Sequence, residues 1–149
     1  MTDPTGAQDG AAPFKTSRIL VPVDMRHAEA SRKAIETAVH FARPVGAEVF
    51  ILTVANPFGT HMTDMPEARK PAFEAFVQAE AARSGYPITA LFQSHESVNE
   101  VIQQVIRQHG VDFVVMATHH PRLADHLFGS HASQTALHGN CSVLIVRNA

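Results

Sequence analysis

A strand, a polar loop and the start of a helix are combined in Phe113-Val-Val-Met-Ala-Thr-His-His-Pro-Arg-Leu-Ala-Asp-His-Leu-Phe-Gly-Ser-His131. The run from Phe113 to Thr118 is apolar until its last residue, which is typical of a parallel strand covered on both faces. Gly129 allows a tight turn, and Ser130 is a natural N-cap for a helix over residues 131–138. A helix N-terminus attracts phosphate, and Arg122 could add a charge-assisted contact. This stretch predicts a phosphate-binding loop behind a buried strand.

Strands and helices are expected to alternate along the rest of the chain. The predicted strands cover Arg18–Val23, Glu48–Val54, Ile88–Gln93, Phe113–Thr118 and Ser142–Arg147. The predicted helices cover Ala28–Ala42, Pro71–Ser84, a segment opened by the capping box Ser97-Val-Asn-Glu100 and ended by Gly110, and residues 131–138. Such alternation implies right-handed parallel crossovers, so the fold class is α/β, a three-layer sandwich with helices on both faces of a parallel sheet.

The bulk composition fits one globular domain and excludes several classes of function. The chain has 149 residues, of which 45% are hydrophobic and 17% charged, with a net charge of −2. It has no block of Lys and Arg to bind nucleic acid, no apolar run of transmembrane length and no signal-peptide core. The single cysteine, Cys141, cannot form an intrachain disulfide, which is consistent with a cytoplasmic protein. Residues 1–16 are poor in large apolar residues, so we expect a disordered tail before a domain over residues 17–149.

Several motifs together resemble the universal stress protein family. They are Val21-Pro-Val-Asp24, Leu52-Thr-Val54 and Met116-Ala-Thr-His-His, followed by Gly129-Ser130 and Cys141-Ser-Val-Leu-Ile-Val-Arg147. The resemblance covers about residues 17 to 147 and implies a Rossmann-like sheet of strand order 3-2-1-4-5. In that order the first and fourth strands meet where the order reverses, and ligands of open α/β sheets bind in the crevice at that point.

The resemblance also indicates which ligand the protein could bind. Many family members bind ATP through the pattern Gly-x2-Gly-x9-Gly-Ser/Thr, whereas this chain has Ala117 and His120 at the first two glycines and a shorter spacing to Gly129-Ser130. Thr-His-His-Pro followed by Leu-Phe-Gly-Ser is similar to the F/G-type branch, which retains the Gly-Ser. The resemblance therefore implies an adenine nucleotide, ATP, ADP or AMP, with or without magnesium.

The residues of the implied nucleotide site lie at the ends of three predicted strands and in one loop. Its candidate residues are Pro22, Val23, Asp24, Thr53, Val54, Met116, Ala117, His119, His120, Arg122, Gly129, Ser130 and His131. Asp24 is either a turn or capping residue, or faces a ribose hydroxyl or a nucleotide-bound magnesium ion. In the family the backbone at Thr53 and Val54 meets the adenine, although both residues could simply end a strand. Gly129-Ser130 could serve as turn, N-cap and phosphate cradle at once.

Neither a structural metal nor an enzyme mechanism is expected from the sequence. His119, His120, His126, His131 and His138 are close in sequence but lack a zinc-ligand pattern, and His119 or His120 beside the phosphates is the preferred interpretation. No nucleophile elbow or Walker A motif is present. At most, the family resemblance allows slow ATP hydrolysis or self-phosphorylation.

Two functional hypotheses follow. The first is a cytoplasmic regulator or sensor of the stress response that binds adenine nucleotide. The alternative is a nucleotide-free family member that acts as a dimeric protein-interaction module. In both, the strand Val143–Arg147 is expected to form a homodimer, because it is apolar and, by the family order, lies at the sheet edge.

Overall fold

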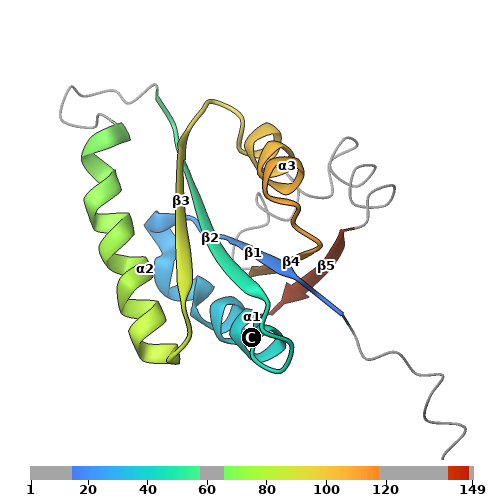
Figure 1. The fold of residues 1–149 in the computed structure, drawn as a ribbon. Helices are drawn as coiled ribbons and strands as arrows, with labels where there is room; N and C mark the ends of the chain where they lie inside the picture. Colours follow the sequence, from blue (N-terminus) through green and yellow to red (C-terminus); the bar gives the residue numbers. More distant parts are fainter. Residues whose placement is uncertain (1–14, 58–65, 118–140, 148–149) are drawn as a thin grey trace, which may run out of the picture.

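The computed structural model describes residues 15–57, 66–117 and 141–147. The sheet has five strands. In Figure 1, β3, β2, β1, β4 and β5 lie side by side in that order. The strands are β1 (Arg18–Pro22), β2 (Glu48–Ala55), β3 (Ile88–Ser94), β4 (Phe113–Ala117) and β5 (Ser142–Val146), and all four neighbouring pairs are parallel. The helices are α1 (Arg32–Ala42), α2 (Lys70–Ser84) and α3 (Val98–His109), with the 3-10 helices η1 (Met25–Ser31) and η3 (Pro66–Arg69). The predicted fold class and strand order are confirmed.

The core consists of two apolar layers, one on each face of the sheet. Ile19 and Val21 of β1 pack on the face covered by α1 and α2, whereas Leu20 packs on the face covered by α3. All three side chains are fully buried. Because successive side chains of a strand point to opposite faces, a central strand covered on both faces needs an unbroken apolar run. This requirement explains the apolar sequences of β1, β2 and β4.

The segment after β1 differs from the helix predicted over Ala28–Ala42. It begins as η1, and α1 starts only at Arg32. The side chain of Asp24 caps η1 by accepting the N–H of Arg26. His27 has φ −133° and ψ 42°, which lies outside the helical region and interrupts the helical hydrogen-bond pattern. Neither Gly nor Pro occurs between Asp24 and Arg32, so no helix-breaking residue predicts this interruption.

The start of α3 follows the predicted capping box in only one of its two hydrogen bonds. Ser97 Oγ accepts the N–H of Glu100 at 3.3 Å, as expected. The N–H of Ser97, however, donates to Nδ1 of His95 at 2.9 Å. His95 thus takes the place that the Glu100 carboxylate has in a complete capping box. The helix ends at Gly110, which has φ 62°, a left-handed conformation that favours glycine.

A buried carboxylate joins α1 to α2. Glu80 on α2 is only 3% exposed. Its carboxylate pairs with Arg83 on the same helix and lies 3.6 Å from Nε of Arg32 on α1. Arg83 also pairs with Glu36 of α1. The two arginines compensate the buried charge, so the network fixes the two helices relative to each other.

The first described residues are attached to the start of β4. Thr16 is 5% exposed, and its hydroxyl donates to Asp112 Oδ1 at 2.5 Å. The other carboxylate oxygen accepts the N–H of Ser17 at 2.8 Å. Thr16, which was expected to belong to a disordered tail, is thus packed against the domain, whereas residues 1–14 lie outside the described residues. None of the helices in the described ranges has the length and apolar composition that a bilayer crossing requires.

Candidate functional site

Seven of the candidate site residues come together at the carboxyl edge of the sheet. Pro22 pairs with Leu52, and Leu20 pairs with Val114. Extending this register along the strands places Val23 level with Thr53 on one side and with Ala117 on the other. The seven residues at this edge are Pro22, Val23, Asp24, Thr53, Val54, Met116 and Ala117. Met116 is 2% exposed, so only its backbone can face a ligand.

The Thr53 side chain closes the gap where β1 leaves the sheet. The N–H of Val23 donates to the C=O of Leu52 at 2.8 Å, and this is the last backbone hydrogen bond between these two segments within the described ranges. The Thr53 hydroxyl then donates to the C=O of Val23 at 2.9 Å. The side chain of Thr53 therefore has a structural role that the sequence analysis did not foresee.

The backbone of Val54 lies just beyond that point. Backbone groups of alternate residues point to the same side of a strand, so those of Val54 point to the β1 side, as those of Leu52 do. β1 ends at Pro22, and the chain turns away into η1 after Asp24. An N–H and a C=O of β2 thus point past the end of β1, on the side of β2 that faces β1 and β4. A planar base that carries both a donor and an acceptor on one edge could bind there.

Asp24 is held by Arg26. Asp24 Oδ1 accepts from the backbone N–H of Arg26 at 3.0 Å and from its Nε at 3.2 Å, while Oδ2 accepts from Nη2 at 3.0 Å. The Asp24 side chain is 19% exposed, and that of Arg26 is 82% exposed. Asp24 thus acts as a cap, which is one of the two roles that the sequence left open. Because Arg26 is almost fully exposed, it can move to leave an oxygen of Asp24 to a ribose hydroxyl or a magnesium ion.

The pKa of Asp24 lies below its ordinary value. Burial of the carboxyl raises the pKa, but the hydrogen bonds and the charge of Arg26, together with the charge of His27, outweigh this effect. The carboxylate therefore stabilises the folded protein at neutral pH. This contribution is complete above the unfolded-state pKa of about 3.9 and is lost as the pH falls through the lower folded-state pKa.

Asp24→Asn should lower the melting temperature at pH 7. The expected loss is below about 1 kcal/mol, because Asn still caps η1 and Arg26 is exposed to solvent. The difference from the wild type should shrink below about pH 4, where the carboxyl becomes protonated. Thermal unfolding followed by circular dichroism over a pH series measures this difference in melting temperature. A difference that is equally large at acid pH would contradict the role assigned to the charge.

The other six candidate residues lie outside the described residues. They are His119, His120, Arg122, Gly129, Ser130 and His131. β4 ends at Ala117, which is level with Val23 at the predicted crevice. Their roles in phosphate binding remain predictions from the sequence.

No metal centre is found in the described part of the chain, where no three or more His, Cys, Asp or Glu side chains are grouped to hold an ion. We predict that excess chelator leaves the melting temperature unchanged, because the sequence lacks a zinc-ligand pattern. Differential scanning calorimetry with and without the chelator measures the melting temperature. A large drop in melting temperature would identify a structural metal among the histidines beyond Ala117.

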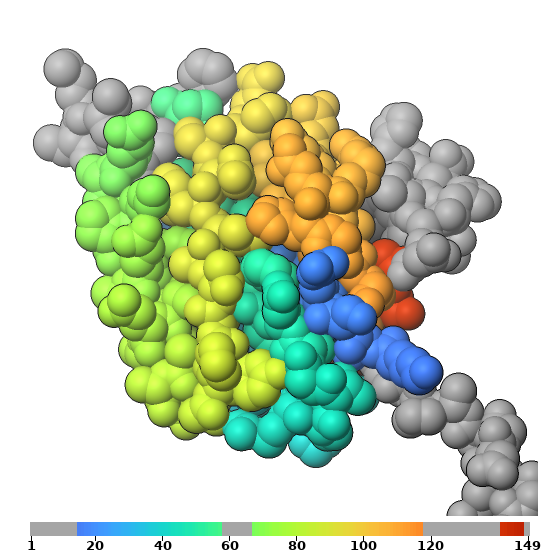
Figure 2. Space-filling model, in the orientation of Figure 1, coloured from blue at the N-terminus to red at the C-terminus, as the bar shows by residue number. Residues whose placement is uncertain are grey.

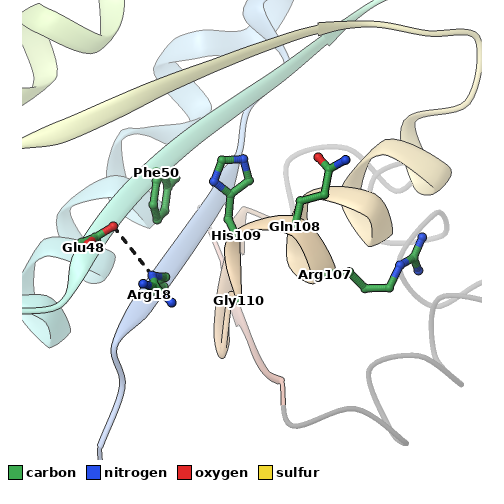
Figure 3. A pocket seen from close by; sticks show the side chains of 7 residues that line it. All are labelled: Arg18, Glu48, Phe50, Arg107, Gln108, His109 and Gly110. Carbon is green, nitrogen blue, oxygen red and sulfur yellow. Dashed lines mark ion pairs between the residues drawn. The ribbon is translucent and has the colours of Figure 1, made fainter.

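A hollow of about 490 Å³ lies at the opposite end of the sheet (Figure 3). It is lined by Arg18, Glu48 and Phe50, by the last three residues of α3, Arg107, Gln108 and His109, and by Gly110, which follows α3. Arg18 Nε is 3.8 Å from Glu48 Oε2, and the ring of His109 lies 5.4 Å from that of Phe50. Figure 2 shows the starts of β1 and β2 beside the end of α3 on this side of the molecule. Basic residues suit the negative end of a helix dipole, so the hollow needs no ligand to explain it.

Two residues near the site were missed by the sequence analysis. Arg26 follows Asp24 by two positions, and only the geometry shows that it binds both carboxylate oxygens. His95 directly follows β3, and its N–H donates to the C=O of Ala55 at 3.0 Å. The signal that could have found His95 is its position, because it follows a parallel strand that ends at the same edge as β1 and β2.

Comparison with known proteins identifies relatives over most of the chain. The model of the universal stress protein family matches residues 15–147. The chain is 29% identical to universal stress protein G of Escherichia coli O157:H7 over 144 residues, which cover 90% of this chain and 99% of that protein. It is 31% identical to universal stress protein C of Salmonella typhi over 113 residues, which cover 71% and 82%.

Solved structures show the same fold at lower identity. A universal stress protein of Lactobacillus plantarum has a TM-score of 0.63 at 22% identity, with 90% of this chain and 99% of that chain covered. The Archaeoglobus fulgidus protein in complex with dAMP has a TM-score of 0.58 at 20% identity, covering 89% and 98%. An Arabidopsis thaliana family protein with AMP bound has a TM-score of 0.57 at 15% identity, covering 89% and 92%. With a family model matching nearly the whole described chain, the protein belongs to the universal stress protein family.

Proposed function

We propose that the protein binds an adenine nucleotide in the crevice between the carboxyl ends of β1 and β4. The ligand is ATP, ADP or AMP, and magnesium bound to its phosphates could reach Asp24. In this proposal the protein acts as a regulator or sensor of the stress response in the cytoplasm, and binding rather than turnover is its primary activity.

The observation that carries the proposal is the backbone of Val54. By alternation along β2 its N–H and C=O point to the β1 side, just beyond Pro22, where β1 ends. A main-chain donor and acceptor side by side match the N1 acceptor and N6 donor of adenine. Two family structures contain dAMP and AMP, which supports an adenine nucleotide as the ligand.

The phosphate end of the site is proposed from the sequence. Gly129 permits close approach of the backbone, and Ser130 opens a predicted helix whose N–H groups suit an anion. Arg122 and one of His119 and His120 would contribute charge or hydrogen bonds, with His131 in the first helical turn. Asp24 would then face the ribose from the end of β1.

A thermal-shift series tests the proposal. ATP, ADP and AMP at concentrations well above their dissociation constants should raise the melting temperature, because a ligand that binds only the folded state stabilises it. GTP at the same concentration and ionic strength is the matched control and should give a smaller shift. Equal shifts with ATP and GTP, or no shift with any nucleotide, would contradict adenine recognition.

We also propose that the protein forms a homodimer through β5. β5 lies at the sheet edge and pairs with β4 on one side. Its residues Val143, Leu144 and Ile145 are only partly buried in the single chain. Pairing with β5 of a second copy would satisfy the outward backbone groups and cover these side chains.

A further inference from the structure

His95 lies at the same edge of the sheet as the backbone of Val54. Its N–H donates to the C=O of Ala55 at 3.0 Å, so it extends the pairing of β2 and β3 beyond Ser94, the last residue of β3. Ala55 directly follows Val54 in β2. His95 is therefore adjacent to the strand end that we propose contacts the base.

The imidazole of His95 lies on the α3 side of the sheet. Its Nε2 is 3.8 Å from Oε2 of Glu100 in the first turn of α3. Val54 and Val98 are partly buried on this same side, where both pack against the α3-facing core cluster. Apolar side chains with one polar group beside them are the usual surroundings of a bound aromatic ring.

The hydrogen bonds of the loop favour one tautomer of the neutral His95 ring. The N–H of Ser97 donates to Nδ1 at 2.9 Å, and a backbone amide can only donate. Nδ1 is therefore an acceptor, and in the neutral ring the proton lies on Nε2. The C=O of Ser97, which is 3.2 Å from Nδ1, accepts the N–H of Val101 at 3.3 Å.

The Nε2–H group is accessible to a ligand. The His95 side chain is 40% exposed, and that of Glu100 is 73% exposed. A separation of 3.8 Å is too long for a hydrogen bond. The Glu100 carboxylate therefore attracts the Nε2–H group electrostatically but does not accept a hydrogen bond from it. The loop thus presents one oriented donor at the ligand edge of the sheet.

We propose that His95 sets the affinity for the nucleotide base by donating Nε2–H to a ring nitrogen of adenine. The inference rests on the proposed function, since it concerns the same nucleotide. Ser97 is the positioning residue that holds the imidazole in the donating tautomer, and Glu100 is displaced as the nearest acceptor when the base binds.

Two substitutions separate a role in the ligand contact from a role in the loop. In His95→Asn the side-chain oxygen can take the place of Nδ1 and still accept the N–H of Ser97, but the outer donor is lost. In His95→Gln the amide nitrogen can take the place of Nε2 and restore the donor. His40→Ala on the exposed surface of α1 is the matched control for removal of a histidine.

The variants should differ in their affinity for AMP. We expect His95→Asn to raise the AMP dissociation constant about five- to tenfold, which corresponds to the loss of one hydrogen bond. His95→Gln and His40→Ala should stay within about twofold of the wild type. Ribose 5-phosphate, which lacks the base, should bind all four proteins equally. Titrations followed by nuclear magnetic resonance measure the dissociation constants of AMP and of ribose 5-phosphate.

The outcomes distinguish the two proposals. A wild type that binds no AMP would overturn the proposed function and this inference with it. If the wild type binds AMP and His95→Asn binds it equally well, the inference alone is overturned. The same holds if His95→Asn weakens AMP and ribose 5-phosphate by the same factor, because His95 would then act only by ordering the loop.

Discussion

Val54→Pro should weaken the binding of ATP and AMP by about tenfold to a hundredfold while leaving the fold intact. Proline removes the N–H of Val54, the group that we propose donates to the base. The sheet does not need this donor. In the described chain, the last backbone hydrogen bond between β2 and the β1 segment is the one that the C=O of Leu52 accepts from Val23. The pairing with β3 continues through Ala55, whose C=O accepts the N–H of His95.

Val54→Ala is the matched control for this substitution. It removes most of the side chain but keeps the backbone N–H, so we expect a smaller loss of nucleotide affinity than in Val54→Pro. Calorimetric titration measures affinity, and thermal unfolding verifies that both variants remain folded. If folded Val54→Pro binds ATP as tightly as the wild type, the backbone of β2 does not contact the base.

Ile145→Pro should convert the proposed homodimer into a monomer. The N–H of Ser142 donates to the C=O of Asp112 beside β4, so the N–H groups of residues 142, 144 and 146 point toward β4. The N–H of Ile145 therefore points to the open edge, where a second β5 would pair with it. Proline deletes this donor without removing a hydrogen bond to β4.

Ile145→Ala distinguishes the contribution of the backbone from that of the side chain, because it keeps the N–H but removes part of the apolar surface. Size-exclusion chromatography with light scattering should give twice the chain mass of 16.2 kDa for the wild type and for Ile145→Ala at micromolar concentration. Ile145→Pro should give the mass of one chain, or become insoluble because its edge is left exposed. A monomeric wild type would show that β5 is not a dimer interface.

The parts of the fold that depend on local sequence could be predicted. Apolar runs marked the buried strands, and the period of apolar residues marked α3, where Val101, Ile102 and Val105 are buried as expected. Strand order came from the family resemblance, because alternation of strands and helices does not determine which strands are neighbours. η1 was missed because its boundary with α1 depends on the backbone angles of His27 and on the cap provided by Asp24.

Features that depend on distant partners could not be predicted. A glutamate on an amphipathic helix is normally exposed, and Glu80 is buried only because arginines of two helices converge on it. Thr16 looked like part of a tail, but Asp112, at the start of β4, holds it. At the site, the sequence identified Asp24 but not the bonds that Arg26 makes to it, because these follow from the turn into η1.

The most direct test of nucleotide binding is a calorimetric titration of nucleotide-free wild-type protein with ATP and magnesium. We expect a saturable heat of binding with one nucleotide per chain, and a larger loss of affinity in Val54→Pro than in Val54→Ala. A titration without binding heat up to millimolar ATP, repeated at a second temperature to exclude a vanishing enthalpy, would contradict adenine-nucleotide binding by this protein.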